Sequence, residues 1–262
     1  MGKIIELKKV NKWFDKFQVL KDIDLEVAPQ EKIVICGPSG SGKSTIARLL
    51  MRFYELQGGS ISLDGHDIRS VTQTSLRSAI SLVPDEPFLF STSVHENISY
   101  GKPGASREEV EAAARAAQAH EFIVGLDDGY DTVVGERGYD LSGGQRQRIS
   151  LARLFLSDPS VIILDDSTSA IDVEIEERIH RSLKELLRER TTIVIAHRLS
   201  TIALADRVVL VDDGQIIADG TSAHHQVAIY EKATGEGADA REALAAVVDW
   251  LAEETLQGVA GD

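Results

Sequence analysis

A glycine-rich segment between an apolar run and a helical pattern constrains the fold of this chain most. The run Ile33–Cys36 predicts a buried strand, and a helix is expected from about Lys43 to Phe53. The segment Gly37–Ser44 fits the pattern G-x-x-x-x-G-K-S/T at every position. Glycines let successive backbone N–H groups point inward, and the following helix adds its positive end. The sequence therefore predicts an anion-binding loop on an α/β framework.

Short apolar runs alternate with helix-period stretches along the rest of the chain, which indicates an α/β fold. Ser106 and Glu109 form a capping-box pattern that predicts a helix running to His120. The remaining elements that we expect are a strand at 61–63 with a turn at 64–65, a strand at 161–164, a helix over 175–186, a strand at 192–196 and a hairpin over 208–217.

The composition indicates a globular protein without a disulfide framework. Of the 262 residues, 43% are hydrophobic and 27% are charged, which excludes a wholly disordered chain. The single cysteine, Cys36, fits a reducing compartment, where we expect it to pack as a small apolar side chain. No apolar run approaches the roughly 20 residues that span a bilayer. We therefore expect a cytoplasmic protein, for which any membrane role would come through a partner.

The net charge of −14 argues against one class of partner. Binding along a nucleic-acid backbone needs a basic surface, so we expect no nucleic-acid partner. Nucleotide binding stays open, because a few backbone amides and one lysine are enough to hold a triphosphate.

A second segment, farther along the chain, is expected to complete the site at the phosphate loop. Val161–Leu164 is a continuous apolar run followed by Asp165 and Asp166, which is typical of a central parallel strand. A carboxylate in the position of Asp165 can hold Mg²⁺ through water, opposite the hydroxyl of Ser44. Lys43 is expected to reach the β- and γ-phosphates of the nucleotide.

The segment Leu141–Arg148, with the letters L-S-G-G-Q-R-Q-R, resembles the signature of the ATP-binding cassette (ABC) family, the nucleotide-binding domains of transporters. The likeness covers about residues 4–220. It implies a P-loop NTPase (RecA-like) α/β core over 1–85 and 157–220, with an antiparallel β edge. It also implies an inserted helical subdomain at 86–156 that carries the signature. Residues 221–262 would add an acidic helical extension.

The family resemblance also implies how the nucleotide is bound. Two copies would dimerise head to tail, with ATP between the phosphate loop of one and the signature of the other. Ser142 and the amides after it can form a second anion-binding surface at a helix start, although a plain helix cap is the alternative. The implied nucleotide-binding set is Phe14, Gly37, Ser39, Gly40, Ser41, Gly42, Lys43, Ser44, Thr45, Ser142, Gly143, Gly144 and Gln145.

Four further segments match the family in order. Phe14 stands where an aromatic ring would stack on adenine, with Trp13 as a rival and core packing as the alternative for both. Gly135–Gly138 resembles the exporter loop that touches the transmembrane partner, and its other interpretation is a solvated turn. Ser169–Asp172 resembles a loop that crosses the dimer. His197 resembles a histidine that contacts the γ-phosphate.

Three positions depart from the family pattern. Asp166 replaces a glutamate that serves as general base, and its stem is one methylene shorter, so slow hydrolysis is expected. Asp85 replaces a glutamine. An ionised aspartate can touch Mg²⁺ but cannot donate a hydrogen bond. Gln30 replaces a turn glycine, at a cost of about 1 kcal/mol if the turn needs a positive φ.

The resemblance changes character along the chain. Residues 14–45 are similar to polar amino-acid importer ATPases, whereas the sequence from about Arg52 onward is similar to exporter domains. This change predicts a recombined or engineered chain. In the tail, Leu244, Val247 and Leu251 fall at helical spacing and predict an acidic amphipathic helix. We expect this helix to pack on the domain, and a regulatory or dimerisation role is the alternative.

These observations predict the ATP-hydrolysing part of an ABC transporter, which binds Mg²⁺ and ATP and works with a transmembrane subunit or domain. A second nucleotide-binding domain completes the site in a homodimer or a heterodimer. The alternative is a weakly catalytic half of a heterodimer that holds ATP, because Asp85 and Asp166 both serve the site built on Lys43. A third possibility, a soluble ABC protein of translation or DNA repair, fits the Gly135–Gly138 loop and the acidic charge less well.

Overall fold

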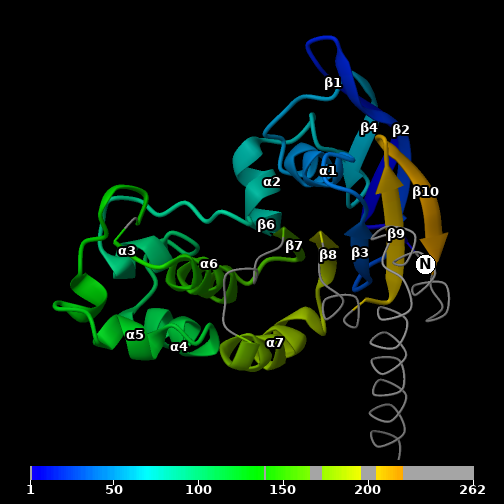
Figure 1. Ribbon diagram of the computed structural model, residues 1–262. Coiled ribbons are helices and arrows are strands. Elements are labelled where there is room, and N and C mark those ends of the chain that lie inside the picture. The colour runs from blue at the N-terminus through cyan, green and yellow to red at the C-terminus, as the bar shows by residue number, and fades with distance from the viewer. Residues whose placement is uncertain (1, 139, 166–172, 196–204, 221–262) are drawn as a thin grey trace, which may run out of the picture. The chain divides into compact units, whose positions relative to one another are not determined.

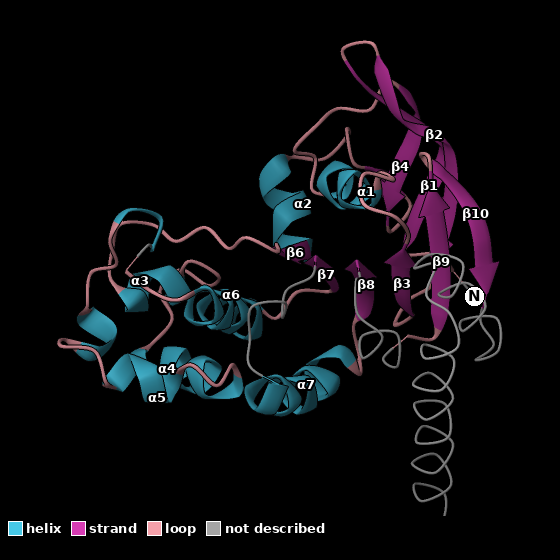
Figure 2. Cartoon of the chain, viewed as in Figure 1, coloured by secondary structure: helices cyan, strands magenta, loops and turns pink. Residues whose placement is uncertain are grey.

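The computed structural model describes residues 2–138, 140–165, 173–195 and 205–220. The chain divides into two compact units. Unit 1 holds Met1–Leu76 together with the chain from Thr191 onward, and unit 2 holds Arg77–Arg190. Strands dominate unit 1 and helices dominate unit 2 (Figures 1 and 2). This α/β content confirms the predicted fold class.

The first sheet of unit 1 is antiparallel, in the order β2-β1-β4-β5. Its apolar side chains alternate with exposed ones along β2, as expected for a sheet with one face buried. The turn between β4 and β5 has positive φ at Asp64 and Gly65, which confirms the turn predicted there. The strands are β1 (Ile5–Phe14), β2 (Phe17–Val27), β4 (Gly58–Leu63) and β5 (His66–Asp67).

The other strands of unit 1 are ordered β10-β9-β3-β8. The central strand β3 pairs in parallel with both β8 and β9, whereas β9 and β10 form the antiparallel hairpin that the sequence predicts. The residues Ile33–Cys36 of β3 are all buried, as its continuous apolar run requires. Helix α1 (Lys43–Leu50) follows β3, which spans Lys32–Cys36. The others are β8 (Thr191–Ile195), β9 (Arg207–Asp212) and β10 (Gln215–Gly220).

In unit 2, two parallel strands accompany a group of helices. Strands β6 (Ile80–Val83) and β7 (Val161–Asp165) pair in register, and α3 and α4 pack against α6. The helices of the chain's middle part are α2 (Gln73–Ala79), α3 (Val94–Ser99), α4 (Arg107–Ala116), α5 (His120–Val124), α6 (Gly143–Ser157) and α7 (Val173–Leu187), with 3₁₀ turns η1 (Gly129–Asp131) and η2 (Glu136–Gly138).

Two helices end earlier than predicted. Helix α1 stops at Leu50 rather than Phe53, and α4 stops at Ala116 rather than His120. Each ends in a Schellman motif with a non-glycine residue in the left-handed region, Arg52 in one and Gln118 in the other. The sequence carries no stop signal there, because these motifs usually place glycine at that position.

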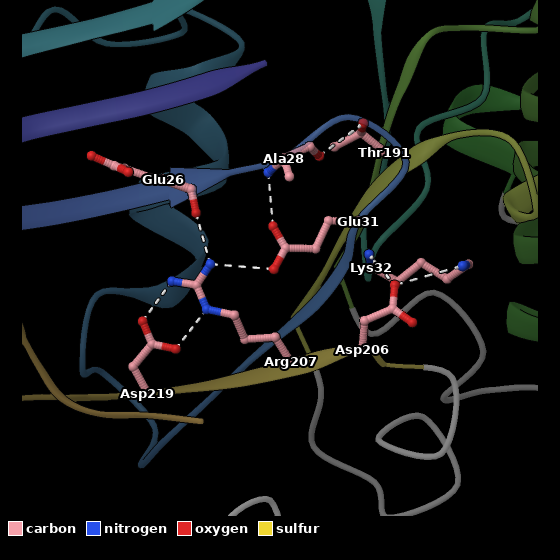
Figure 3. Close-up of polar contacts among 8 residues, drawn as sticks. All are labelled: Glu26, Ala28, Glu31, Lys32, Thr191, Asp206, Arg207 and Asp219. Carbon is pink, nitrogen blue, oxygen red and sulfur yellow. Dashed lines mark hydrogen bonds and ion pairs between the residues drawn. The ribbon is translucent and has the colours of Figure 1, made fainter. Parts of the chain in front are cut away.

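At the end of β3 opposite the glycine-rich loop, Arg207 joins four segments of unit 1 (Figure 3). Its guanidinium donates a bidentate pair of hydrogen bonds to Asp219, at 2.6 and 2.5 Å. It also donates to the carbonyl of Glu26 at 2.8 Å and to the Glu31 carboxylate at 3.3 Å. Glu31 in turn accepts a hydrogen bond from the Ala28 amide at 2.7 Å. These contacts fix the turn between β2 and β3, which contains Gln30.

Replacing Gln30 with glycine is expected to raise the free energy of unfolding by about 0.5–1 kcal/mol. Gln30 has a φ of 62°, a left-handed backbone conformation that is strained for a residue with a Cβ. Relief of about 1–2 kcal/mol is partly offset by glycine's greater freedom in the unfolded chain. The Gln30 amide keeps its hydrogen bond to Thr191 Oγ1, at 2.8 Å, in either variant. Chemical denaturation measures the difference. Gln215→Gly, in β10, is the matched control and should lower stability; equal effects of both changes would contradict the strain.

Candidate nucleotide-binding site

The glycine-rich loop of unit 1 leaves the end of β3 and enters α1. Two of its glycines are required by their surroundings. Gly37 has a φ of 145°, and a Cβ there would stand 1.9 Å from the Val211 carbonyl oxygen. Gly42 has a φ of 105°, and a Cβ there would lie 2.7 Å from a methyl group of Leu20. Only glycine fits at both positions, so the motif specifies the backbone path of the loop.

Lys43 and Ser41 give the loop its polar interior. Lys43 is 5% exposed, and its ammonium donates hydrogen bonds to the carbonyls of Gly37 at 2.7 Å and Pro38 at 2.8 Å. Ser41 is buried, and its hydroxyl has no hydrogen-bond partner within the described part of the chain. An unpartnered buried hydroxyl is destabilising by about 1–3 kcal/mol. The residues present therefore fit an anion, which would supply an acceptor beside a fixed positive charge.

A cavity of about 280 Å³ lies against this loop, within unit 1. Its lining joins the start of α1 to the hairpin formed by β1 and β2. Phe14 lines the cavity and is 39% exposed, whereas its rival Trp13 is not among the lining residues. The lining consists of Phe14, Phe17, Val19, Ser39, Gly40, Gly42, Lys43, Ser44 and Thr45.

Sequence reasoning missed Phe17 and Val19. Phe14 and Phe17 are opposite each other across the two-residue turn of the hairpin. Opposed residues in an antiparallel pair project to the same face, so the alternation of this hairpin was the available signal. Phe17 is 68% exposed, which makes it a second aromatic side chain at the mouth of the cavity.

Cys36 lies directly before the loop and is buried, as predicted. Its thiol donates a weak hydrogen bond to the Val209 carbonyl at 3.6 Å. Burial raises the pKa of the Cys36 thiol to about 11, so the thiol stays protonated near neutral pH. The side chain therefore packs as a small apolar group and takes no nucleophilic part.

In unit 2, Asp85 and Asp165 come at the same edge of a parallel strand pair. Val83 of β6 is paired with Leu164 of β7, so both strands end at this edge. Asp85 is exposed, and its backbone carbonyl accepts a hydrogen bond from Gln147 at 3.2 Å. Among the described residues, no three histidine, cysteine or acidic side chains gather as a metal-binding group. A Mg²⁺ ion that takes most of its ligands from water and phosphate needs no such group.

The signature segment begins helix α6. Ser142 is the N-cap: its hydroxyl accepts from the Gln145 amide at 3.2 Å, and the Gln145 side chain accepts from the Ser142 amide at 2.8 Å. The cap that the sequence offered as an alternative is therefore present. Ser142 is also exposed, and the first amides of a helix have no partners within the helix. Capping and anion binding are thus compatible at this helix start.

The loop Gly135–Gly138 is a short 3₁₀ turn. The Gly135 amide donates to the Asp140 carboxylate at 3.1 Å, and the Gly138 amide donates to the Gly135 carbonyl at 2.9 Å. Arg146 of α6 donates to the Leu141 carbonyl at 2.5 Å. These hydrogen bonds fix the conformation of the turn and of the segment that leads into α6.

Several predicted residues lie outside the described part of the chain. They include the general-base candidate Asp166, the segment Ser169–Asp172, His197 and the tail 221–262. Their predicted roles stay predictions.

Comparison with known proteins identifies the family. The model of the ABC transporter family matches residues 20–169, more than half of the chain. The chain therefore belongs to the ABC transporter family, and its fold is that of a P-loop NTPase. Within the family it corresponds to the ATP-binding domain.

Two relatives show how far the likeness extends. ATP-binding cassette sub-family B member 6 of Xenopus tropicalis is 49% identical over 217 residues, which is 82% of this chain and 26% of the relative. The ATP-dependent lipid A-core flippase of Syntrophus aciditrophicus is 47% identical over 216 residues, 82% of this chain and 36% of the flippase.

A solved structure supports the same assignment. A bacterial Atm1-family ABC exporter with ATP bound superposes with a TM-score of 0.83 at 41% identity, covering 91% of this chain and 43% of the exporter. This chain spans less than half of each of these relatives. Within the described part of the chain, no helix has both the length and the apolar character to cross a membrane.

Proposed function

We propose that this chain binds Mg·ATP at the loop Gly37–Ser44 and drives transport through a transmembrane partner. The observation that carries the proposal is the loop itself, with the buried ammonium of Lys43 and the hydroxyl of Ser41, which has no partner among the described residues. Lys43 would hold the β- and γ-phosphates, and Phe14 would stack on the adenine. Ser44 and Asp165 would hold Mg²⁺, with Asp85 as a further contact. The metal would supply neutralising charge at the phosphates.

ATP would be closed in by a second copy or a related domain. The exposed start of α6, at Ser142 with Gly143, Gly144 and Gln145, supports this assembly because the first amides of a helix have no partners within it and the positive end of a 15-residue helix lies there. The head-to-tail arrangement is what the family resemblance implies for these residues.

Within the site, Asp166 would orient the attacking water and His197 would contact the γ-phosphate. Catalysis would come mostly from positioning and charge. We expect slow turnover, because Asp166 reaches about one C–C bond less far than glutamate and small misplacements can lower rates about 10²-fold. In a heterodimer, this chain would hold ATP at its own weak site while its signature completes the site of a partner.

A transmembrane subunit or domain would dock on unit 2. Three aromatic side chains there are unusually exposed: Phe88 at 52%, Phe90 at 38% and Tyr100 at 65%. Their rings touch in series, with centroids 5.2 and 4.9 Å apart. An exposed aromatic cluster of this kind is typical of a protein–protein interface.

The loop Gly135–Gly138 directly follows residues whose backbone pairs with the segment after Phe90. Ser93 and Val133 form a β-bridge, and the Val134 amide donates to the Thr92 carbonyl at 2.9 Å. The aromatic cluster and the loop that is predicted to touch the partner therefore belong to one surface region of unit 2.

We propose that the chain is cytoplasmic and peripheral to the inner or plasma membrane when assembled, that it meets the membrane only through this partner, and that it binds no nucleic acid. The proposed division keeps 1–85 and 157–220 as the core, 86–156 as the helical subdomain and 221–262 as an extension.

ATP-driven assembly tests the head-to-tail proposal. The chain is expected to sediment as a monomer alone and as a dimer with Mg·ATP, in an Asp166→Asn background that suppresses turnover. Ser142→Asp should abolish the dimer, because aspartate still caps the helix but sets a negative charge against the γ-phosphate. Ser106→Asp makes the same change at the capping box of α4 and should leave the dimer intact. A Ser142→Asp chain that dimerises as readily as the Ser106→Asp control would refute the arrangement.

A further inference from the structure

The ring of Phe14 is held by two neighbours that the predicted site did not include. The ammonium of Lys12 lies over the Phe14 ring, 4.9 Å from its centroid. The ring of Tyr54 meets it edge to face, with the centroids 5.1 Å apart and the planes at 85°. A cation over an aromatic face and an edge-to-face pair are both attractive arrangements. The two contacts restrain the position and the orientation of the Phe14 ring.

Lys12 is itself fixed in place. Its side chain is 6% exposed, although lysine is seldom buried. The ammonium donates a hydrogen bond to the Glu55 carbonyl at 2.9 Å and lies 5.6 Å from the centroid of the Tyr54 ring. The charged ammonium is therefore held between two aromatic rings and one carbonyl, where it is largely shielded from solvent.

With Lys12 over one face of the Phe14 ring, the rest of the ring can border the cavity. The Lys12 ammonium lies over one face of the ring, and Phe14 as a whole is still 39% exposed and lines the cavity beside the glycine-rich loop. A ring held in this way loses little further freedom when a planar group stacks on it. An unrestrained phenylalanine at the tip of a hairpin would have to be ordered at the moment of binding.

We propose that Lys12 and Tyr54 are positioning residues, which hold Phe14 ready to stack on the nucleobase. The proposal rests on the proposed function, since it assumes that the cavity takes a nucleoside triphosphate. Both residues act through Phe14 and neither touches the phosphates. We therefore expect them to strengthen binding only of ligands that have a nucleobase, and to have no effect on ligands without one.

Binding of ATP and of inorganic tripolyphosphate to the full-length chain, measured by titration calorimetry, separates the two contributions. Lys12→Met keeps the aliphatic stem and removes the charge. It should weaken ATP binding about three- to tenfold, in line with a partly desolvated cation–π contact. It should leave tripolyphosphate binding unchanged. Lys12→Arg should restore ATP binding, because a guanidinium also stacks on aromatic faces. Lys16→Met, an exposed lysine in the turn of the same hairpin, is the charge-matched control and should change neither affinity.

A double-mutant cycle supplies the decisive readout. In a Phe14→Ala background, Lys12→Met should have no further effect on ATP binding, because a positioning residue has nothing left to position. Tyr54→Ala should behave like Lys12→Met, whereas Tyr54→Phe should bind ATP as the wild type does. Thermal unfolding of each variant shows whether the fold is intact.

Each alternative outcome contradicts a different claim. Equal losses for ATP and tripolyphosphate, or effects of Lys12→Met and Phe14→Ala that add in full, would overturn the positioning role. If Lys43→Ala weakens neither ligand, the phosphate loop is not the binding site and the proposed function fails first. If Lys43→Ala weakens both while Lys12→Met weakens neither, the proposed function stands and this inference is wrong.

Discussion

Replacing Lys43 with alanine is expected to weaken ATP binding about a hundredfold, since each charge-assisted hydrogen bond to a phosphate contributes roughly 1.5–3 kcal/mol. Lys43 is buried, and its ammonium lies within the loop on the carbonyls of Gly37 and Pro38. The charge is therefore already desolvated and oriented, so the interaction with a phosphate is strong. Fluorescence titration with a labelled ATP analogue measures the loss.

The change also removes two hydrogen bonds from the loop, so stability has to be measured beside affinity. Lys43→Arg keeps the charge and should bind ATP between the wild type and Lys43→Ala. Lys16→Ala removes an exposed lysine from unit 1 and should bind as the wild type does. Wild-type affinity in a folded Lys43→Ala chain would show that ATP binds elsewhere.

Replacing Asp166 with glutamate is expected to raise the turnover number by up to about 10²-fold, with little change in KM. If residue 166 is the general base, as proposed, the added methylene would bring its carboxylate closer to the attacking water, toward the roughly 2.6–3.2 Å that proton transfer requires. A base that acts only in the transition state changes kcat and leaves ground-state binding alone. Steady-state phosphate release over a range of ATP concentrations measures both constants.

Asp166→Asn is the matched control for this change. It keeps the size of the side chain and removes the base, so its turnover should fall below that of the wild type. Asp165→Glu lengthens the neighbouring carboxylate, which is proposed to hold Mg²⁺, and should lower turnover. An Asp166→Glu chain no faster than the wild type would show that reach does not limit the reaction.

Motifs with a local physical cause could be predicted from the sequence. The strand before the loop, the loop itself and the N-cap at Ser142 all depend on residues close together in the chain, and the structure has them. Helix ends were less predictable. Arg52 and Gln118 adopt left-handed conformations, which the hydrogen bonds of each Schellman motif stabilise. Neither arginine nor glutamine is a residue type that predicts the end of a helix.

The surroundings of the aromatic side chain could not be predicted for a different reason. Phe14 meets Lys12 two residues away along β1, but Tyr54 lies forty positions farther on, beyond α1. Only the folded chain brings these rings together. The family resemblance singled out Phe14 and left Trp13 as a rival, and the cavity lining favours Phe14. The importer-like character of residues 14–45 and the origin of the chain stay predictions.

Phosphate release by the purified wild-type chain in Mg·ATP, set beside that of Lys43→Ala, tests the central claim most directly. We predict a slow rate that saturates with ATP and clearly exceeds the Lys43→Ala rate. A wild-type rate equal to that of Lys43→Ala, raised by Asp166→Glu, would instead make this chain the ATP-holding half of a heterodimer. A wild-type rate equal to that of Lys43→Ala, with no gain from Asp166→Glu, would contradict the proposal that the loop Gly37–Ser44 hydrolyses ATP.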